Sequence, residues 1–432
     1  MILAMSAATV LSPLTAFADA EEQELNIAIF QGGYGDAYWN QMVELFEESH
    51  EGVKVNMTIS PTIGDIIRPQ IVAGNVPDFI CLNDGGEDGV ILSLIKEHAL
   101  LNLNDVFDGE NYAGTGTLRD DITDGILASS KCAPYGDGDI YLAPFNSGPQ
   151  GLIYNKTFFD ENNLEVPKTW EEMADTCKKL KDGGYSDFGF SQPRDIWYFW
   201  MMVETYGGPV FSEDGLKLDC LDNGSAVEAF NLLQGMVKDD TFRPAPTTEG
   251  ANTIKGWFSG GECAFLVQSV GALNEIRSAC EESGVNMEIA QIPGHEIDGK
   301  VRYAVPYGGN TMVMLESSQH KDAAWKFMQW LYTSEDGIAY FDDNTGYLAC
   351  SGTVKNTELL KAKAANDADW ARAHEYLDTI VTDYLIEASG DVVEDLTAFM
   401  DAVFYDAEDP KTALEEQRAN VEEILADHEG RP

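Results

Sequence analysis

The sequence predicts an α/β protein of two lobes, each built on a parallel-rich sheet, and three observations lead to this prediction. The chain has 432 residues, which exceeds one typical domain. Strand and helix patterns alternate along its first part, as they do in parallel sheets with crossover helices. A segment punctuated by proline and glycine, residues 141–151, then precedes a second series of elements. We therefore expect this segment to pass from one lobe to the other.

The first lobe opens with strands at 25–30, 53–59 and 78–82, a helix that Asp36 caps, and a helix at 63–73. Trp39, Met42 and Phe46 recur at helical spacing, so Trp39 is expected in the core. In open parallel sheets, ligands bind beyond the carboxyl ends of the strands. The loops at 31–36 and 83–86 are therefore expected at a binding site.

The second series begins after the crossing segment. Thr169 is expected to cap a helix, with Glu172 three residues later completing a capping box. Residues 183–189 are expected to form a loop, and Trp200 is expected in the core of a tryptophan-rich helix. The predicted elements are strands at 151–154, 287–293 and 303–314, and helices at 156–162, 169–181, 195–203, 226–237, 317–332, 370–386, 392–404 and 412–428.

The composition is that of a globular chain with a large excess of acidic groups. Hydrophobic residues make up 44% and aromatic residues 10%, which excludes a disordered polymer. There are 74 acidic and 27 basic residues, and the formal net charge is −47. Such a surface repels phosphate backbones, so nucleic-acid binding is excluded. We interpret the acidic shell as a source of solubility rather than as a cation site.

Residues 1–20 have the pattern of a signal peptide, although they lack a basic n-region. They are apolar, rich in small residues, and end in two A-x-A motifs at 16–18 and 18–20. We expect an exported protein, in the periplasm or at the outer face of the cytoplasmic membrane. No other stretch is apolar and long enough for a transmembrane helix.

Several phrases of the sequence resemble the extracellular solute-binding proteins of ABC sugar importers, of the bacterial family 1 type. The phrases are FEESHEGVKV at 46–55, AGNVPD at 73–78, YNK at 154–156, PKTW at 167–170, FSGGECAFL at 258–266 and SSQHKDAAWKFMQWLY at 317–332. The resemblance implies a fold similar to periplasmic binding proteins of type II, with two α/β lobes joined by a multi-strand hinge. The GGYG turn at 32–35 and the pair Arg68-Pro69 look most like the branch that binds N-acetylglucosamine and chitobiose.

The resemblance also implies a division of the chain. Residues 1–20 would be the signal peptide, 25–145 plus about 306–365 the N-terminal lobe, and 146–305 plus about 366–432 the C-terminal lobe. The chain would cross between lobes near 144–151, near 304–310 and near 360–369. Such a protein would act as a monomer without a cofactor or metal. Its partners would be a carbohydrate ligand and the permease subunits of an ABC transporter.

A sugar presents C–H faces and hydroxyl groups, so its site needs aromatic plates and short polar side chains. Trp197 and Tyr198 are about equally compatible with a place in the core and a place in the ligand site. Tyr34 lies between glycines in a loop and is favoured as a ligand contact. Trp257 precedes Phe258, Ser259 and Gly260, and the resemblance implies that the position of Trp257 itself is frequently buried. The expected ligand-binding residues are Tyr34, Asn83 and Asp84 on the first lobe, Asn146, Tyr307 and Asn310 at the crossings, and Arg194, Trp197, Tyr198, Trp257 and Gln268 on the second lobe.

Catalytic and metal-binding patterns do not stand out. The six histidines lack metal-ligand spacing, and neither a G-x-S-x-G elbow nor a G-x-G-x-x-G loop occurs. The seven cysteines show no paired spacing, so they indicate either buried thiols or a reducing habitat. We expect a binding protein rather than an enzyme. Two alternatives stay open, namely a secreted carbohydrate-active enzyme and a polyamine-binding protein, because an acidic surface attracts cations.

Overall fold

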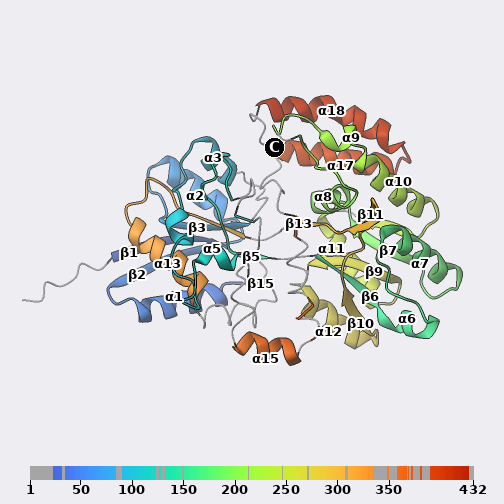
Figure 1. Cartoon of the computed structure of the whole chain (residues 1–432), viewed down its shortest axis with the longest axis horizontal. Coiled ribbons are helices and arrows are strands. Elements are labelled where there is room, and N and C mark those ends of the chain that lie inside the picture. Colours follow the sequence, from blue (N-terminus) through green and yellow to red (C-terminus); the bar gives the residue numbers. More distant parts are fainter. Residues whose placement is uncertain are drawn as a thin grey trace, which may run out of the picture.

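The computed structural model describes residues 23–31, 35–83, 90–122, 126–127, 132–147, 150–212, 214–245, 247–269, 272–306, 310–334, 348–349, 358–366, 368, 371–372, 380–381 and 390–427. It has two α/β lobes that lie side by side, each with its own five-stranded mixed sheet (Figure 1). The predicted two-lobed α/β fold is therefore confirmed. Short strands lie between the lobes.

The first sheet has the strand order β2-β1-β3-β14-β4. Its parallel part consists of β1 (Gln23–Phe30), β2 (Val53–Ser60) and β3 (Phe79–Asn83). Two later strands extend it, because β14 (Asn310–Val313) runs antiparallel to both β3 and β4 (Ala143–Pro144). The parallel opening was predicted, and β14 shows that the chain returns to this lobe.

Helices cover this sheet with their apolar faces. The helix α1 (Ala37–Ser49) buries Trp39, Met42 and Phe46, which recur at helical spacing. Asp36 precedes α1 as predicted, but its side chain makes no cap hydrogen bond. The other helices of the lobe are α2 (Ile63–Val72), α3 (Val90–Lys96), α4 (Asn104–Phe107), α5 (Leu118–Asp121) and α13 (Lys321–Thr333).

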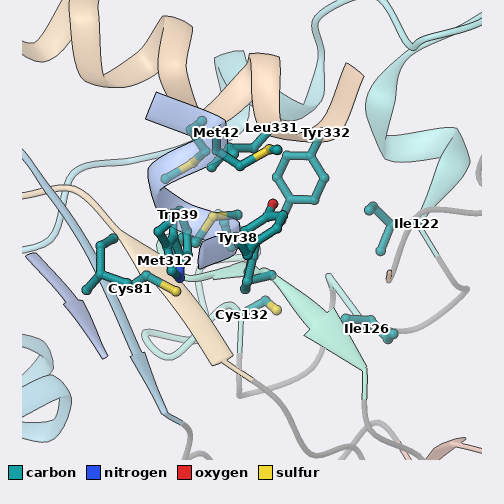
Figure 2. Close-up of a cluster of buried hydrophobic side chains, with 14 of the residues drawn as sticks. Tyr38, Trp39, Met42, Cys81, Ile122, Ile126, Cys132, Met312, Leu331 and Tyr332 are labelled. Carbon is teal, nitrogen blue, oxygen red and sulfur yellow. The ribbon is translucent and has the colours of Figure 1, made fainter. Parts of the chain in front are cut away.

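The core of the first lobe brings α1 against α13, and Figure 2 shows the two helices meeting through Met42, Leu331 and Tyr332. Trp39 is fully buried, as predicted, and stacks on Phe145 at a centroid distance of 4.9 Å. The hydroxyl of Tyr332 donates a hydrogen bond to the carbonyl oxygen of Pro144. This bond anchors the end of β4, where the chain leaves the first sheet.

The second sheet has the strand order β10-β6-β9-β7-β8. Its strands are β6 (Gln150–Asn155), β7 (Phe188–Pro193), β8 (Phe242–Ala245), β9 (Cys263–Ser269) and β10 (Met287–Ala290). β9 and β10 run antiparallel to β6, whereas β7 is parallel to both β8 and β9. The strand β7 begins inside the predicted loop 183–189, so that loop prediction was too long by two residues.

Nine helices surround the second sheet in the described ranges. They are α6 (Lys156–Asn162), α7 (Trp170–Asp182), α8 (Ile196–Thr205), α9 (Asp219–Asp222), α10 (Ser225–Lys238), α11 (Thr247–Ser259), α12 (Leu273–Ser283), α17 (Gly390–Phe404) and α18 (Pro410–Asp427). The last two helices pack with α8 and α10 in one apolar cluster, which also buries the predicted core residue Trp200.

The predicted cap of α7 is present in a modified form. The Thr169 hydroxyl oxygen accepts a hydrogen bond from the Glu172 N–H at 3.2 Å. The Glu172 carboxylate reaches back, but it accepts from the N–H of Lys168 at 2.7 Å instead of from the cap residue itself. Both interactions satisfy backbone donors around the first turn.

Two pairs of short strands connect the lobes (Figure 1). β5 (Asn146–Ser147) pairs with β15 (Leu348–Ala349), and β13 (Val305–Pro306) pairs in parallel with β16 (Ile380–Val381). The strand β16 contradicts the helix predicted at 370–386. Its β-branched residues suit an extended chain, and β13 supplies its backbone hydrogen-bond partners.

The remaining described elements are α15 (Glu358–Asn366) and the hairpin of β11 (His295–Ile297) with β12 (Lys300–Arg302). The six described cysteines are buried free thiols, which agrees with the first of the two sequence readings. Helices long and apolar enough to cross a membrane are absent from the described ranges.

Candidate functional site

The topology brings four strand ends of the first lobe to one edge of its sheet. The parallel strands β1, β2 and β3 end there with Phe30, Ser60 and Asn83. The antiparallel strand β14 begins there, and its first residue, Asn310, lies opposite Asn83. We call Phe30, Ser60, Asn83 and Asn310 the first edge.

The second lobe presents a matching set of strand ends. The strand β6 begins with Gln150, which pairs with Ser269 at the end of β9. The strands β7 and β8 end at the same level, with Pro193 opposite Ala245. We call Gln150, Pro193, Ala245 and Ser269 the second edge. Because β5 passes from the first sheet directly to β6, the second edge is the one turned toward the first lobe.

Two predicted residues, Asn146 and Asn310, meet at the junction of the lobes. The side-chain Oδ1 of Asn146 accepts a hydrogen bond from the Asn310 N–H at 2.7 Å. The N–H of Phe145 donates to the Asn310 carbonyl at 2.8 Å. Both asparagines are buried, with exposed fractions of 1% and 7%. The pair therefore ties the first crossing of the chain to the strand that returns to the first lobe.

Arg194 follows β7 directly and lies at the second edge. Its backbone N–H donates to the Ala245 carbonyl at 3.2 Å, which fixes its position at the end of β8. Its guanidinium Nη1 lies 2.7 Å from Oδ1 of Asp401 on α17, and its Cζ lies 5.6 Å from the ring centre of Tyr405. The cation predicted for the ligand site is thus paired with a carboxylate of the protein.

Two neighbouring residues predicted as ligand contacts, Trp197 and Tyr198, have different surroundings at the start of α8. Asp195 caps the helix by accepting from the Tyr198 N–H at 2.9 Å, and burial raises the pKa of its carboxyl to about 6 against the lowering effect of its backbone hydrogen bonds. Trp197 is half-buried at this helix start. Tyr198 is 2% exposed and packs against Trp170 and Phe242. The structure places Tyr198 in the core, where its ring has no surface at the edge.

Three glutamines supply amide groups at or near the second edge. The half-buried Gln268 is the residue before Ser269, and its Oε1 accepts the Ser269 N–H at 2.9 Å. Gln150 and Gln192 were not predicted from the sequence. Among the described residues, the buried Oε1 atoms of both have no hydrogen-bond partner. Their only sequence signal is position, at the start of β6 and near the end of β7.

Trp257 lies away from the second edge. Its ring meets Phe188 edge-on at a centroid distance of 5.4 Å, and the Arg243 guanidinium lies 5.6 Å from its ring centre. Phe188 is the first residue of β7, whereas the second edge is formed where β7 ends. The indole therefore serves the packing of α11 on the sheet in this structure.

Three predicted contacts, Tyr34, Asp84 and Tyr307, lie outside the described residues. Asn83 is described only as the last residue of β3, opposite Asn310. These four stay predictions. Within the described ranges, no group of three or more His, Cys, Asp or Glu residues could hold a metal ion.

Comparison with known proteins gives one family. Residues 32–338 match the model of the bacterial extracellular solute-binding proteins. The maltotriose-binding protein of Pyrococcus abyssi is 25% identical over 311 residues, which cover 72% of this chain and 62% of that protein. The sn-glycerol-3-phosphate-binding periplasmic protein UgpB of Brucella melitensis is 32% identical over 227 residues, or 49% of each chain.

Proteins of solved structure share the fold of this chain. The sugar-binding protein MalE of Xanthomonas citri superposes with a TM-score of 0.76, covering 94% of this chain and 98% of that one at 19% identity. At that identity, the likeness concerns the two-lobed architecture alone.

Proposed function

The chain belongs to the bacterial extracellular solute-binding protein family, a family of binding proteins rather than enzymes, and from this premise we propose that it captures a neutral carbohydrate for an ABC importer. The ligand would be an oligosaccharide or an N-acetylated amino sugar, as in the chitobiose-binding branch. Family membership implies export of the protein. Its partners would be the permease subunits, to which it would deliver the sugar as a monomer.

The observation that carries the proposal is the chemistry of the two edges. Amide groups of Gln150, Gln192, Gln268 and Asn310 lie at or one residue from them, and the half-buried Trp197 at the start of α8 packs against the core of the second lobe. Amides donate and accept hydrogen bonds, as ring hydroxyls require, and an indole covers a C–H face. We propose Tyr34, Asn83, Asp84 and Tyr307 as further contacts from the loops that adjoin the same edges.

The proposed mechanism is closure of the lobes on the ligand. A sugar that contacts both edges gains these contacts only in the closed arrangement, so binding shifts the open–closed equilibrium by the difference in affinity. Short paired strands between rigid lobes suit such a hinge motion. The permease subunits would then bind the closed form.

A second candidate is an ester of glycerol phosphate, because one relative, the Brucella UgpB protein, is described as binding sn-glycerol 3-phosphate. The charge of this chain disfavours an anionic ligand, since its formal net charge is −47. A polyamine suits that charge, but the described edges carry amides rather than unpaired carboxylates. Neutral sugars fit both observations.

A thermal-shift screen tests the proposal. Chitobiose, maltotriose, xylo-oligosaccharides and manno-oligosaccharides would be compared with spermidine and sn-glycerol 3-phosphate. A true ligand at 100 times its Kd stabilises the folded state by about 2.7 kcal/mol. We expect a neutral glycan to do so, and stabilisation by spermidine or the phosphate ester alone would overturn the proposal.

Two further measurements define the mode of action. Small-angle scattering should show a smaller radius of gyration with the stabilising glycan, as closure requires. Chromatography of that glycan after prolonged incubation should recover it intact, whereas release of products would identify an enzyme. Tyr34→Ala should weaken binding of the glycan without lowering the melting temperature of the free protein, and an unchanged affinity would remove Tyr34 from the site.

A further inference from the structure

The position of Arg194 at the second edge is fixed on three sides. Its N–H is bonded to Ala245, the preceding residue ends β7, and the following residue, Asp195, caps α8. The register of β7 with β9 pairs Ser191 with Leu266, so Arg194 comes level with Ser269 and, across β9, with Gln150. The backbone of Arg194 therefore lies at the second edge, which the proposed ligand would meet.

The charge of this guanidinium is matched by a residue from another part of the chain. Asp401 lies on α17, which packs on the second lobe after the chain has visited the first lobe and returned. Its Oδ1 lies 2.7 Å from Nη1 of Arg194, and the two side chains are only 39% and 21% exposed. Partial burial strengthens the attraction between them and the repulsion of any other anion nearby.

The pairing leaves part of the guanidinium available to a ligand. An arginine carries five N–H donors, and Asp401 contacts one of its nitrogens at this distance. Beside Asp401, the Arg194 side chain keeps 21% of its surface exposed. The guanidinium also lies over the ring of Tyr405, four residues after Asp401, with its Cζ 5.6 Å from the ring centre. Arg194 can thus donate to a neutral hydroxyl while its charge is already compensated.

We propose that Asp401 is a specificity-determining residue, which keeps Arg194 from binding phosphate and so restricts the site to uncharged ligands. This inference rests on the proposed sugar-binding function. A free arginine binds phosphate through two parallel hydrogen bonds with full charge attraction. With Asp401 in place, a phosphate ester must bring a second anion against a carboxylate that is partly shielded from water. A glycan hydroxyl meets no such repulsion.

The test is whether removal of the Asp401 charge creates phosphate binding. Asp401→Asn keeps the shape of the side chain, and Asp401→Ser is a second variant if the first fails to fold. The matched control is Glu394→Gln, which removes one exposed carboxylate from the same helix. Isothermal titration would use sn-glycerol 3-phosphate and inorganic phosphate, at low and at high sodium chloride, on protein with a normal melting temperature.

We expect wild type and Glu394→Gln to show no saturable heat with either anion. Both Asp401 variants should bind sn-glycerol 3-phosphate saturably, with a Kd at least tenfold below the weakest that the titration can detect and an affinity that falls as salt increases. The double variant Arg194→Gln/Asp401→Asn should lose this binding again. The inference is wrong if folded Asp401 variants bind neither anion. It is also wrong if wild type binds either of them.

The result is separable from the proposed function. If a neutral glycan stabilises wild type but the Asp401 variants do not bind phosphate, only the role of Asp401 is overturned. A wild type that binds sn-glycerol 3-phosphate and no neutral glycan would overturn both.

Discussion

Asn146 accepts the backbone N–H of Asn310 at 2.7 Å through its side-chain oxygen, and this buried bond joins two strands that enter and leave the junction between the lobes. One strand carries the chain toward the second lobe, and the other brings it back to the first sheet. The bond therefore fixes the relative position of two of the crossings. The proposed closure of the lobes would therefore take place around this bond.

Replacing Asn146 with Ala should destabilise the protein. The variant leaves the Asn310 N–H buried without this acceptor, which costs about 1–3 kcal/mol of unfolding free energy. Urea denaturation followed by tryptophan fluorescence would measure the loss. The control is Asn56→Ala on the edge strand β2, where the amide makes an exposed hydrogen bond of 3.3 Å. A loss for Asn146→Ala no larger than that of the control would contradict the prediction.

Asp78 should be a larger contributor to the first lobe. Its side chain is 2% exposed and accepts hydrogen bonds from the Asn26 N–H at 2.9 Å and from the Ser318 hydroxyl at 2.7 Å, while His320 Nδ1 lies at 3.1 Å. It joins β1 to the residues that precede α13. We expect Asp78→Ala to cost about 3 kcal/mol or more, because several buried donors lose their partner at once. Ser318→Ala removes one donor and should cost about 1 kcal/mol in the same denaturation experiment. Equal losses for the two variants would show that the carboxylate does not organise this group.

The raised pKa of Asp195, about 6 in the folded protein against 3.8 as the ordinary value, predicts a pH effect on stability. Between these values the folded state holds the proton more tightly than the unfolded chain, so this group lowers stability as pH rises from about 4 to about 6. Asp195→Asn keeps a side-chain oxygen for the cap and removes the titration.

The difference in unfolding free energy between Asp195→Asn and wild type should therefore be small near pH 4 and grow to roughly 1 kcal/mol or more in favour of the variant above pH 7. Asp36→Asn is the control, because Asp36 precedes α1 without a side-chain cap bond. A difference that does not change with pH would show that Asp195 is not the group responsible.

Tyr198 should tolerate loss of its hydroxyl. The oxygen is buried, and in the described part of the chain it has no hydrogen-bond partner. Tyr198→Phe is expected to leave stability unchanged or to raise it by up to about 1 kcal/mol, and to leave glycan affinity unchanged. Tyr154 is the matched comparison, because its hydroxyl donates to Glu288. Tyr154→Phe should lose about 1–2 kcal/mol in thermal denaturation. A weakened glycan affinity in Tyr198→Phe would return this residue to the ligand site.

Gln192 should contribute to ligand binding and little to folding. Its buried Oε1 lacks a partner within the described ranges, and we propose that a ligand hydroxyl donates to it in the closed form. We expect Gln192→Ala to weaken binding of the stabilising glycan about 5- to 50-fold, which corresponds to one or two hydrogen bonds. Gln319→Ala, at an exposed glutamine of the first lobe, should leave the Kd unchanged. Equal Kd values in titrations of both variants would remove Gln192 from the site.

The elements with a strong local pattern could be predicted from the sequence. The parallel strands β1 to β3 and the helices α1, α7, α17 and α18 have clear periodicity or caps, and their positions are confirmed within a few residues. The strand β7 was missed because FGFSQP is short and its first two residues fall in the glycine-rich segment 183–189, which indicated a loop. Only the fold shows why Gly189 is needed there, since a Cβ would overlap the Cβ and Sγ of Cys177.

The site was less predictable because its partners come from distant segments. The sequence singled out Arg194, but nothing local marks Asp401 as its partner among 74 acidic residues. Tyr198 was predicted as a ligand contact because it lies close after a loop. The first turn of α8 instead places its ring in the core of the second lobe. The helix predicted at 370–386 failed for a similar reason, since β16 depends on pairing with β13.

The burial of the described cysteines has a consequence for folding of the protein after export. Burial raises the pKa of the Cys280 thiol to about 11 and pushes that of Cys177 higher still, so the reactive thiolate is scarce at these two described cysteines. An exported protein meets oxidants, and its unfolded chain exposes every thiol to them. Folding and oxidation are then competing reactions. If folding is faster, newly exported molecules bury their thiols and reach the native state. If oxidation is faster, they are trapped with mispaired disulfides.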